Sequence, residues 1–596
     1  MALFAPSESP AVVVKEIDLT GGVPNVQSTT GAMTGNFRWG PVLQRQNIAN
    51  EAELVSTFAS PDDTNAVDFL TASQFLRYSS SMVIVRNIDS DGSGNEPASA
   101  FAMQGGSTTT SLDNPLVLNT ADFATREASL IAAEDSNSVG YHFIAKFPGD
   151  LGNSLKVSYL PAQSTDSAWD LWDYKGSFDA RPETSVFAAG NGASYDEMHL
   201  AVIDEDGKFS GTRGTILETF PGLSIVRGAK NTEGSSVFAR DVVNATSNYI
   251  WMTNFSTAQD SAGAGASIVL DKNYIVDAAD RVAQEVSLGN GVNSGSLKLG
   301  AHLAGNDLFE DRDQVEVDFL IAPNFATQTD HVTAVNDLVA TAQSLRKDCV
   351  VIASPNRDAI LSTSNDAARV TNSVATCSQF TRSSYLVVSN NFVKIYDKYN
   401  DRYVDIADAS TIAGIIAATD YNRAPWFSPA GTRRGQLLGI TSIAYSPTKG
   451  QRDTLYKAGI NPVANIPGQG VLLFGDKTFL GRVSAFDRIN VRRLFLILER
   501  AIGRAAEQVM FEFNDEFSRA EFVNIVEPVL REIKGRRGIT DFRVVCDETN
   551  NTGAVIDRNE FIANIFIKPA RSINYVTLNF AAVRTGVDFE EVVGTV

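Results

Sequence analysis

The chain has 596 residues, of which 43% are hydrophobic, and carries a net charge of −20. This length predicts several domains, because a single hydrophobic core rarely grows beyond about 250–300 residues, and no apolar run approaches the roughly 20 residues of a membrane span. The acidic balance argues against a protein that coats DNA or anionic membranes, and three cysteines favour a reducing compartment over a disulfide framework.

Residues 1–22 are expected to form an N-terminal arm. The start of the chain has neither the basic nor the apolar region of a signal peptide. Its β-prone run follows Pro10 and comprises Val12, Val13, Val14, Lys15, Glu16 and Ile17. A short strand with no hairpin partner beside it pairs either at long range within its own fold or with another chain. The residues alone leave both options open.

The next segment, residues 23–95, is assigned together with residues 196–310 to a middle domain. Apolar residues from Leu54 to Leu76 follow helical spacing. The apolar run Met82–Arg86 is expected to be a buried strand. This part of the chain therefore combines strands with a helix.

A stretch rich in Ser, Gly, Asp and Asn, from Asn87 to Thr110, is typical of a linker. It is expected to lead into an outer domain inserted over residues 96–195. The region beyond it shows short strands separated by turns. Within that region, Met198–Ile203 and Gly214–Glu218 predict a β-hairpin.

Residues 311–570 are expected to form the main α/β core, in which residues 315–354 are the clearest βαβ unit. Val315–Ala322 and Cys349–Ala353 predict strands, and the apolar residues between them follow helical spacing. Crossover connections of this kind join parallel strands with a right-handed turn. The two strands are therefore expected in one parallel sheet.

The sequence offers little for catalysis. Gly470–Thr478 resembles a phosphate-binding loop, but Asp476 displaces Lys477 from its register, and the residues between the glycines are those of a buried strand. The four histidines are scattered, with no spacing that brings two onto one helix face: His142, His199, His302 and His331. No two cysteines are close enough in sequence for a zinc site. We predict no catalytic residue, no metal site and no cofactor.

A helix predicted from about Arg488 to Met510 has two contrasting faces. Its apolar residues, between Val491 and Val509, share one arc at 100° per residue. The opposite arc carries Arg488, Arg492, Arg493, Arg500 and Arg504. Arginine suits carboxylate pairing across an interface, and the alternative is a solvated face with internal ion pairs. The residues leave these two interpretations open.

A second helix is predicted from Asp515 to Lys534, with Pro528 expected to kink it. Apolar alternation predicts strands after this helix, at Phe542–Cys546, Phe561–Ile567 and Ile573–Phe580. The last strand belongs to a C-terminal strand and arm, residues 571–596. One face of that strand carries Val576, Leu578 and Phe580.

Charge is unevenly distributed along the chain. Residues 481–596 contain 16 basic and 17 acidic residues, so 19 of the 20 net negative charges lie upstream. An acidic outside with a locally basic inner surface fits a shell around a partner. An acidic protein with a tighter C-terminal domain fits the same numbers.

Seven stretches of the C-terminal block stand out by their order and spacing: Gly468–Thr478, Ile489–Leu494, Asn514–Phe517, Arg536–Ile539, Cys546–Asn551, Lys568–Asn574 and Arg584–Phe589. Five more precede them: Ser9–Glu16, Gly211–Phe220, Ser247–Trp251, Asp420–Trp426 and Ser428–Gly435. Together they resemble the contractile tail sheath proteins of T4-like phages. The resemblance runs nearly end to end and is weakest from about residue 96 to 195.

The resemblance implies a multidomain, mixed α/β and α+β fold with a C-terminal α/β sheath core, extended β arms and mainly β outer domains. In that family, subunits form hexameric rings stacked around a rigid tube. Their N- and C-terminal arms add strands to the sheets of neighbouring subunits. The sheath contracts and drives the tube through the host envelope, and the arginine-bearing helix resembles the helix that faces the tube.

The implied partners are further copies of the chain, the tail tube protein, and the baseplate and tail terminator proteins. No direct contact with nucleic acid and no membrane insertion are implied. The implied location is the virion tail, after assembly in the host cytoplasm.

Two alternatives stay open. Within the same class, the chain could be the sheath of a phage-like bacteriocin or injection system, although the large inserted domains favour a phage tail. From a different class, it could be a hydrolytic tail or envelope-degrading enzyme.

Overall fold

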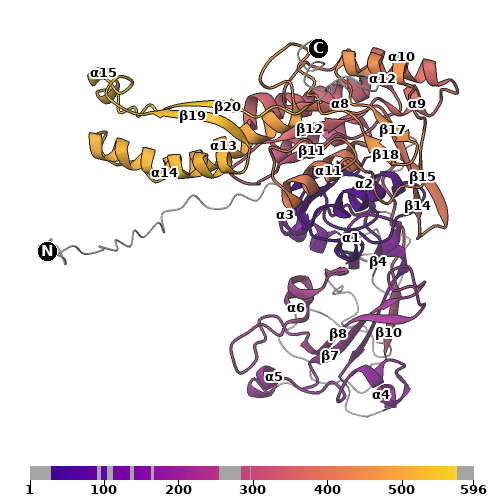
Figure 1. The fold of residues 1–596 in the computed structure, drawn as a ribbon. Coiled ribbons are helices and arrows are strands. Elements are labelled where there is room, and N and C mark those ends of the chain that lie inside the picture. The colour runs from indigo at the N-terminus through magenta and orange to yellow at the C-terminus, as the bar shows by residue number, and fades with distance from the viewer. Residues whose placement is uncertain are drawn as a thin grey trace, which may run out of the picture. The chain divides into compact units, whose positions relative to one another are not determined.

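The computed structural model describes residues 29–89, 96–103, 112–133, 140–162, 167–192, 194–253, 283–295 and 297–573. The expected arm strands, with Val12–Ile17 and Val576–Phe580, lie outside these residues. The chain divides into two compact units (Figure 1). The C-terminal unit contains the described residues 424–428 and 493–573, and the main unit contains the others. Within the described residues, no helix combines the length and apolarity needed to cross a membrane.

A six-stranded sheet forms the centre of the main unit. The strands are β1 (Gly31–Gly35), β2 (Arg45–Ile48), β3 (Met82–Arg86), β11 (Phe319–Ile321), β12 (Val350–Ala353) and β13 (Leu386–Val388). Their order is β13-β12-β11-β1-β3-β2, and only β2 runs antiparallel to its neighbour. The parallel strands are buried along their whole length, as expected where helices cover both faces.

The predicted βαβ unit is confirmed. Strands β11 and β12 pair in parallel, and between them lie α8 (Gln328–Ala340) and a π-helical segment, Thr341–Arg346. The predicted strand at Met82–Arg86 is confirmed as β3.

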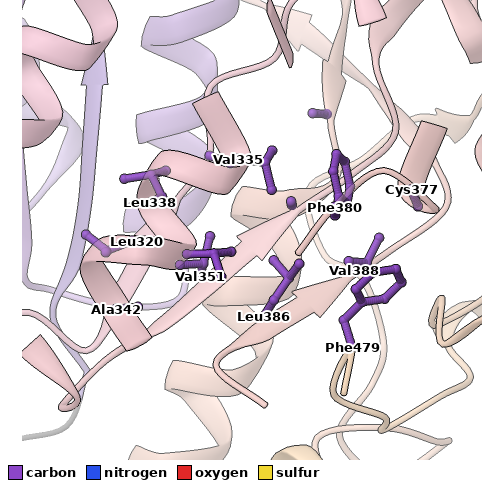
Figure 2. Close-up of a cluster of buried hydrophobic side chains, with 14 of the residues drawn as sticks. Leu320, Val335, Leu338, Ala342, Val351, Cys377, Phe380, Leu386, Val388 and Phe479 are labelled. Atoms are coloured by element: carbon purple, nitrogen blue, oxygen red, sulfur yellow. The ribbon is translucent and has the colours of Figure 1, made fainter. Parts of the chain in front are cut away.

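Helices cover one face of this sheet through a continuous apolar core. The helices are α8, α10 (Asp366–Cys377) and α12 (Lys449–Ala458). Figure 2 shows part of this core, in which Val335 and Leu338 of α8 lie near Leu320, Val351 and Leu386 of the sheet. This packing explains why the apolar residues between β11 and β12 follow helical spacing: they form the face of α8 that packs on the sheet.

The other face of the sheet is covered by α2 (Ala66–Leu76) and α11 (Ala409–Asn422), which also contact each other. The approach of α2 to β1 is close. A Cβ atom on Gly31 would lie 2.6 Å from the ring of Phe75. Only glycine fits there without displacing the ring.

The prediction of one helical run from Leu54 to Leu76 is wrong. The structure has two helices, α1 (Glu51–Phe58) and α2, separated by a loop that contains Pro61. The side chain of Asn50 caps α1 by accepting a hydrogen bond from the Glu53 backbone at 2.9 Å. Proline lacks the backbone donor that a continuous helix would need at this point.

A mainly β insertion lies between β3 and β11. One sheet has the order β10-β6-β7-β8 (Gln284–Ser287, Leu155–Pro161, Glu197–Asp204, Thr215–Ser224), and another has the order β4-β5-β9 (Phe101–Met103, Tyr141–Ala145, Ile250–Met252). The predicted hairpin is confirmed as the antiparallel pair β7–β8. The two sheets share one core, to which Phe143, Val157 and Val202 contribute.

The sheets join segments that the sequence assigned to different domains. Strand β1 of segment 23–95 pairs with β11 of segment 311–570. The insertion core likewise joins segment 96–195 to part of segment 196–310. Both connections depend on long-range pairing, which local composition does not show. The other expected boundaries stay predictions.

Further elements complete the main unit. The helices are α3 (Thr120–Ala132), α4 (Ser167–Leu171), α5 (Val186–Gly190), α6 (Ala239–Thr246), α7 (Leu299–Asn306) and α9 (Arg357–Ile360). The strands are β14 (Phe392–Asp397), β15 (Arg402–Ala407) and β16 (Ser442–Ile443) in one sheet, and β17 (Val463–Ile466) and β18 (Gly470–Leu473) in another. Short 3-10 turns lie at Asp150–Ser154, Lys175–Ser177 and Asp307–Phe309.

The C-terminal unit is built from two long helices and a two-stranded antiparallel sheet. Its elements are α13 (Ile489–Glu507, which enters the unit at Arg493), α14 (Glu516–Gly535), β19 (Ile539–Val545), α15 (Gly553–Ile556) and β20 (Asn564–Pro569). Both predicted helices are confirmed, and Pro528 lies inside α14. The side chain of Asp515 caps α14 by accepting a hydrogen bond from the Ser518 backbone at 2.8 Å.

Candidate assembly surfaces

The predicted arginine face begins with Arg488, immediately before α13. The guanidinium Nη1 of Arg488 donates to Asp476 Oδ1 at 2.8 Å and also to the hydroxyl of Tyr456 in α12. Lys477 Nζ donates to the Tyr456 carbonyl at 2.8 Å. Asp476 and Lys477, the two residues that depart from the phosphate-loop pattern, therefore hold the segment after β18 against α12 and the start of α13.

Arg492 and Arg493 do not lie on an exposed surface. The Nη2 atom of Arg492 donates to Ser384 Oγ at 2.8 Å. The Arg492 guanidinium also lies 4.2 Å from the ring centroid of Tyr385 and 4.3 Å from that of Phe486. Arg493 is only 1% exposed. The expectation of one open arginine face is therefore wrong at these two positions, because a helical period does not show which segments cover a face.

Arg500 and Arg504 lie one turn apart on the part of α13 that belongs to the C-terminal unit. Both are partly exposed. The structure thus brings two of the five predicted arginines to the surface of this unit. Their contact with a tube stays a prediction.

Large apolar side chains are exposed where α13 ends and α14 begins. The exposed fractions are 58% for Met510, 103% for Phe511, 83% for Phe513 and 76% for Phe517. We call these four residues the apolar tip. Phe511 also has a φ of 70°, a backbone conformation that bulky residues rarely adopt. Clusters of exposed apolar side chains mark interaction surfaces more often than single ones do.

Acidic residues surround the apolar tip. Glu507, Glu512 and Glu516 are exposed on the same stretch of chain. Asn514 fixes this stretch to the loop after α15, because its Nδ2 donates to the Glu560 carbonyl at 2.8 Å. The apolar tip was missed from the sequence, although four large apolar residues among the eight positions 510–517 gave a signal for it.

Among the residues that the structure describes, one face of the β19–β20 sheet is covered. Phe542, Val544, Ile565 and Ile567 pack on the core of the C-terminal unit, which includes Phe522 of α14. The other face presents exposed side chains such as Phe566. Within the described residues this sheet has two strands. Hairpins of two strands are marginal alone and gain stability from further strands or from a packed helix.

The histidines serve as buried parts of the scaffold. His331 Nε2 donates to the Ser354 carbonyl at 2.7 Å, and burial lowers the pKa of His331 to about 4. Burial also lowers the pKa of His302 to about 4 and that of His142 well below its ordinary value. His199 is held from both sides, by Ala180 and Gly222. Among the described residues, no three His, Cys, Asp or Glu side chains gather in a way that could hold a metal ion.

The fold is that of a multidomain α/β protein whose C-terminal unit carries the apolar tip and a partly covered sheet. Such an arrangement is typical of a subunit that assembles with other chains. Comparison with known proteins agrees with this class. Residues 302–479 match the phage tail sheath protein central domain, and residues 483–582 match the phage tail sheath C-terminal domain.

The match extends over nearly the whole chain. The chain is 31% identical to the tail sheath protein of Vibrio phage KVP40, over 98% of this chain and 99% of that protein. It is also 31% identical to the tail sheath protein of Enterobacteria phage T4, with the same coverage of both chains. The chain therefore belongs to the phage tail sheath family.

A solved structure supports the fold. The crystal structure of a sheath tail protein from Listeria innocua matches with a TM-score of 0.52 at 11% identity, covering 93% of this chain and 94% of that one.

Proposed function

We propose that the protein is the structural subunit of a contractile phage tail sheath. It polymerises as stacked hexameric rings around a tail tube and contracts to drive that tube through the host envelope for genome delivery. The observation that carries this proposal is the end-to-end match at 31% identity to two tail sheath proteins. The subunit belongs to the virion tail and assembles in the host cytoplasm.

Arms that add strands to neighbouring sheets provide the links between subunits. The β19–β20 sheet supports this part of the proposal, because its two strands present backbone groups to a further strand. A strand with ~4–6 backbone hydrogen bonds, each contributing ~0.5–1.5 kcal/mol, stabilises a link by several kcal/mol. The arm segments proposed for this role are Val12–Ile17 and the strand with Val576, Leu578 and Phe580.

Deletion of residues 1–19 tests the arm. The truncated chain is expected to fold as a monomer that forms no long tubes, as judged by circular dichroism, light scattering and negative-stain microscopy. A matched control replaces the same residues with a Gly/Ser stretch of equal length, which restores length but not β-propensity. Normal tubes from both variants would refute the arm proposal.

Contact with the tail tube is proposed for the exposed part of the C-terminal unit. The candidates are Arg500 and Arg504, for their charge, and the apolar tip at the end of the same helix. Baseplate and tail terminator proteins are the proposed partners at the two ends of the sheath. Co-assembly of purified sheath and tube proteins tests the contact, with Arg500→Glu/Arg504→Glu as the variant.

The proposed role is structural and not enzymatic. An activity assay of the purified subunit on cell-wall and glycan substrates tests this point, and clear turnover would contradict it. Microscopy of the assembled particle separates a phage tail from a bacteriocin or injection system, since only the former carries a DNA-filled head.

A further inference from the structure

One stretch of the main unit is basic, although the chain as a whole is acidic. Residues 449–488 contain six basic and three acidic residues, so this stretch carries +3 in a chain of −20. It comprises α12, β17, β18 and the segment that follows β18. A basic surface attracts acidic partners, and further copies of an acidic chain are such partners.

The segment after β18 lies along α12. Near the start of the helix, the guanidinium of Arg452 lies 5.6 Å from the ring centroid of Phe474. One turn further on, Lys477 Nζ lies 4.0 Å from the ring centroid of Tyr456. Both basic groups therefore lie on the side of α12 that this segment follows, and Phe474 on the same side is 49% exposed.

A third basic group lies where α12 ends. Arg382 Nη1 donates to the Ala458 carbonyl at 2.9 Å. The side chain of Arg382 also reaches the continuation of the segment, because a Cβ atom on Gly481 would lie 3.2 Å from Arg382 Cδ. Arg482 and Val483 follow directly and are exposed, Val483 to 92%. We call the following six residues the basic patch: Arg382, Arg452, Phe474, Lys477, Arg482 and Val483.

The arginines of the basic patch can pair with acidic groups of a partner. Arg452 Nη1 donates to the Pro447 carbonyl at 3.2 Å, and Arg382 donates to a carbonyl of α12. In the part of the chain that the structure describes, neither guanidinium forms an ion pair with a carboxylate. Guanidinium groups pair strongly with carboxylates, and interfaces are enriched in arginine and aromatic residues. The basic patch thus combines two arginines without an acidic partner with the exposed apolar side chains of Phe474 and Val483.

The apolar tip has the complementary composition. Residues 507–517, which contain the tip, include four acidic residues and no basic one. Glu507 and Glu512 are exposed next to the large apolar side chains of the tip. In a contact between tip and patch, apolar side chains would meet at the centre and carboxylates would meet guanidinium groups around them.

We propose that the apolar tip of one copy binds the basic patch of a neighbouring copy. The two surfaces differ, so the contact is heterologous, and every copy offers one tip and one patch. Heterologous contacts continue from copy to copy and build rings or helical filaments. The inference rests on the proposed sheath function, assigns the apolar tip to a neighbouring subunit, and leaves tube contact to Arg500 and Arg504.

Self-association of the full-length chain without the tube protein tests this contact. Sedimentation velocity over a concentration series gives the concentration at which assembly begins, and negative-stain microscopy shows the products. Phe513→Ser is expected to raise that concentration about tenfold, because it removes an aromatic side chain from the centre of the contact. Leu171→Ser, at a side chain of the insertion that is 83% exposed, is the matched control and is expected to leave the concentration unchanged.

Exchange of charges tests whether these two surfaces meet. Glu507→Lys/Glu512→Lys reverses the charge of the tip, and Arg452→Glu/Arg482→Glu reverses that of the patch. Each double variant is expected to raise the concentration for assembly about tenfold, and all four changes together are expected to recover most of the loss. Lys230→Glu, at an exposed position of the insertion, is the control and is expected to have no effect. Circular dichroism checks that every variant is folded.

The outcomes separate this contact from the proposed function. A Phe513→Ser protein that forms tubes like the wild type, and loses only co-assembly with the tube protein, would overturn the proposal and place the tip on the tube. A fourfold charge variant that assembles no better than the two double variants would also overturn it. If the wild type self-associates with the expected response to charge exchange but forms no tubes, the contact stands and the proposed function fails.

Discussion

The six-stranded sheet of the main unit and the β19–β20 sheet of the C-terminal unit differ in how much of their surface the chain itself covers. The six-stranded sheet has helices on both faces, and its parallel strands are buried throughout. As far as the chain is described, the β19–β20 sheet has two strands and one covered face, with exposed residues such as Phe566 on the other face. The first sheet is complete within one chain, whereas the second has the properties of an interface. Stability and assembly should therefore respond to different mutations.

A large effect on stability is expected from a change in the core of the covered six-stranded sheet. Leu386→Ala removes a fully buried side chain of β13 and should lower the free energy of unfolding by about 2–5 kcal/mol. Urea unfolding followed by circular dichroism measures this. Leu386→Met is the matched control, with an expected loss below about 1.5 kcal/mol. Equal losses for both variants would show that the site is not tightly packed.

Charge reversal at two arginines of α13 compares a buried position of this helix with a partly exposed one. Arg492→Glu places a carboxylate between two rings and beside Ser384, and should destabilise the fold by about 3–5 kcal/mol. Arg500→Glu, a reversal at a partly exposed site, should change stability by less than about 1 kcal/mol. Thermal unfolding of the two variants decides this. The opposite order of stabilities would contradict the structural placement of these residues.

A smaller effect is expected from a buried carboxyl next to the covered sheet. Asp408 precedes α11, accepts a hydrogen bond from Ser389 Oγ, and has its pKa raised to about 7 by burial. A raised pKa favours the protonated folded state, so this stabilisation is present at low pH and is lost as the pH rises through 7. Between pH 6 and pH 8 the free energy of unfolding should fall by about 1 kcal/mol more in the wild type than in Asp408→Asn. Parallel pH slopes would contradict this assignment.

The smallest effect on stability is expected at the apolar tip. Phe513→Ser should change the free energy of unfolding by less than about 0.5 kcal/mol, because the side chain is already in water. Its effect should appear in assembly, as fewer or shorter tubes by microscopy or weaker co-assembly with the tube protein. Phe522→Ser, inside the core of the same unit, is the contrasting variant and should destabilise the fold strongly. A Phe513→Ser protein that assembles normally would remove the tip from the interface.

Much of the local structure was predictable. The two long helices of the C-terminal block, the βαβ unit and the β7–β8 hairpin all follow from periodicity and turn signals within a few tens of residues. The prediction of one helix from Leu54 to Leu76 was wrong, because helical spacing on both sides of Pro61 hid the break between α1 and α2. Periodicity is an average over many residues, so it does not detect a helix break that a single proline causes at one position.

The candidate surfaces were predicted less well. Helical phase placed five arginines on one arc of α13, but Arg492 and Arg493 are buried while Arg500 and Arg504 reach the surface. The apolar tip was not predicted, since large apolar residues between two helices are as compatible with a core as with a contact surface. Burial depends on the whole fold, so the sequence of one segment does not reveal which other segments pack against it.

The sequence by itself determined the class of the protein, its principal helices and strands, and its membership of the tail sheath family. Only the tertiary structure decided that β1 lies between β3 and β11, that the insertion sheets share one core, and which arginines and phenylalanines are exposed. The reason is physical. Local propensity and periodicity act over a few turns of chain, whereas strand neighbours and burial depend on contacts between residues hundreds of positions apart.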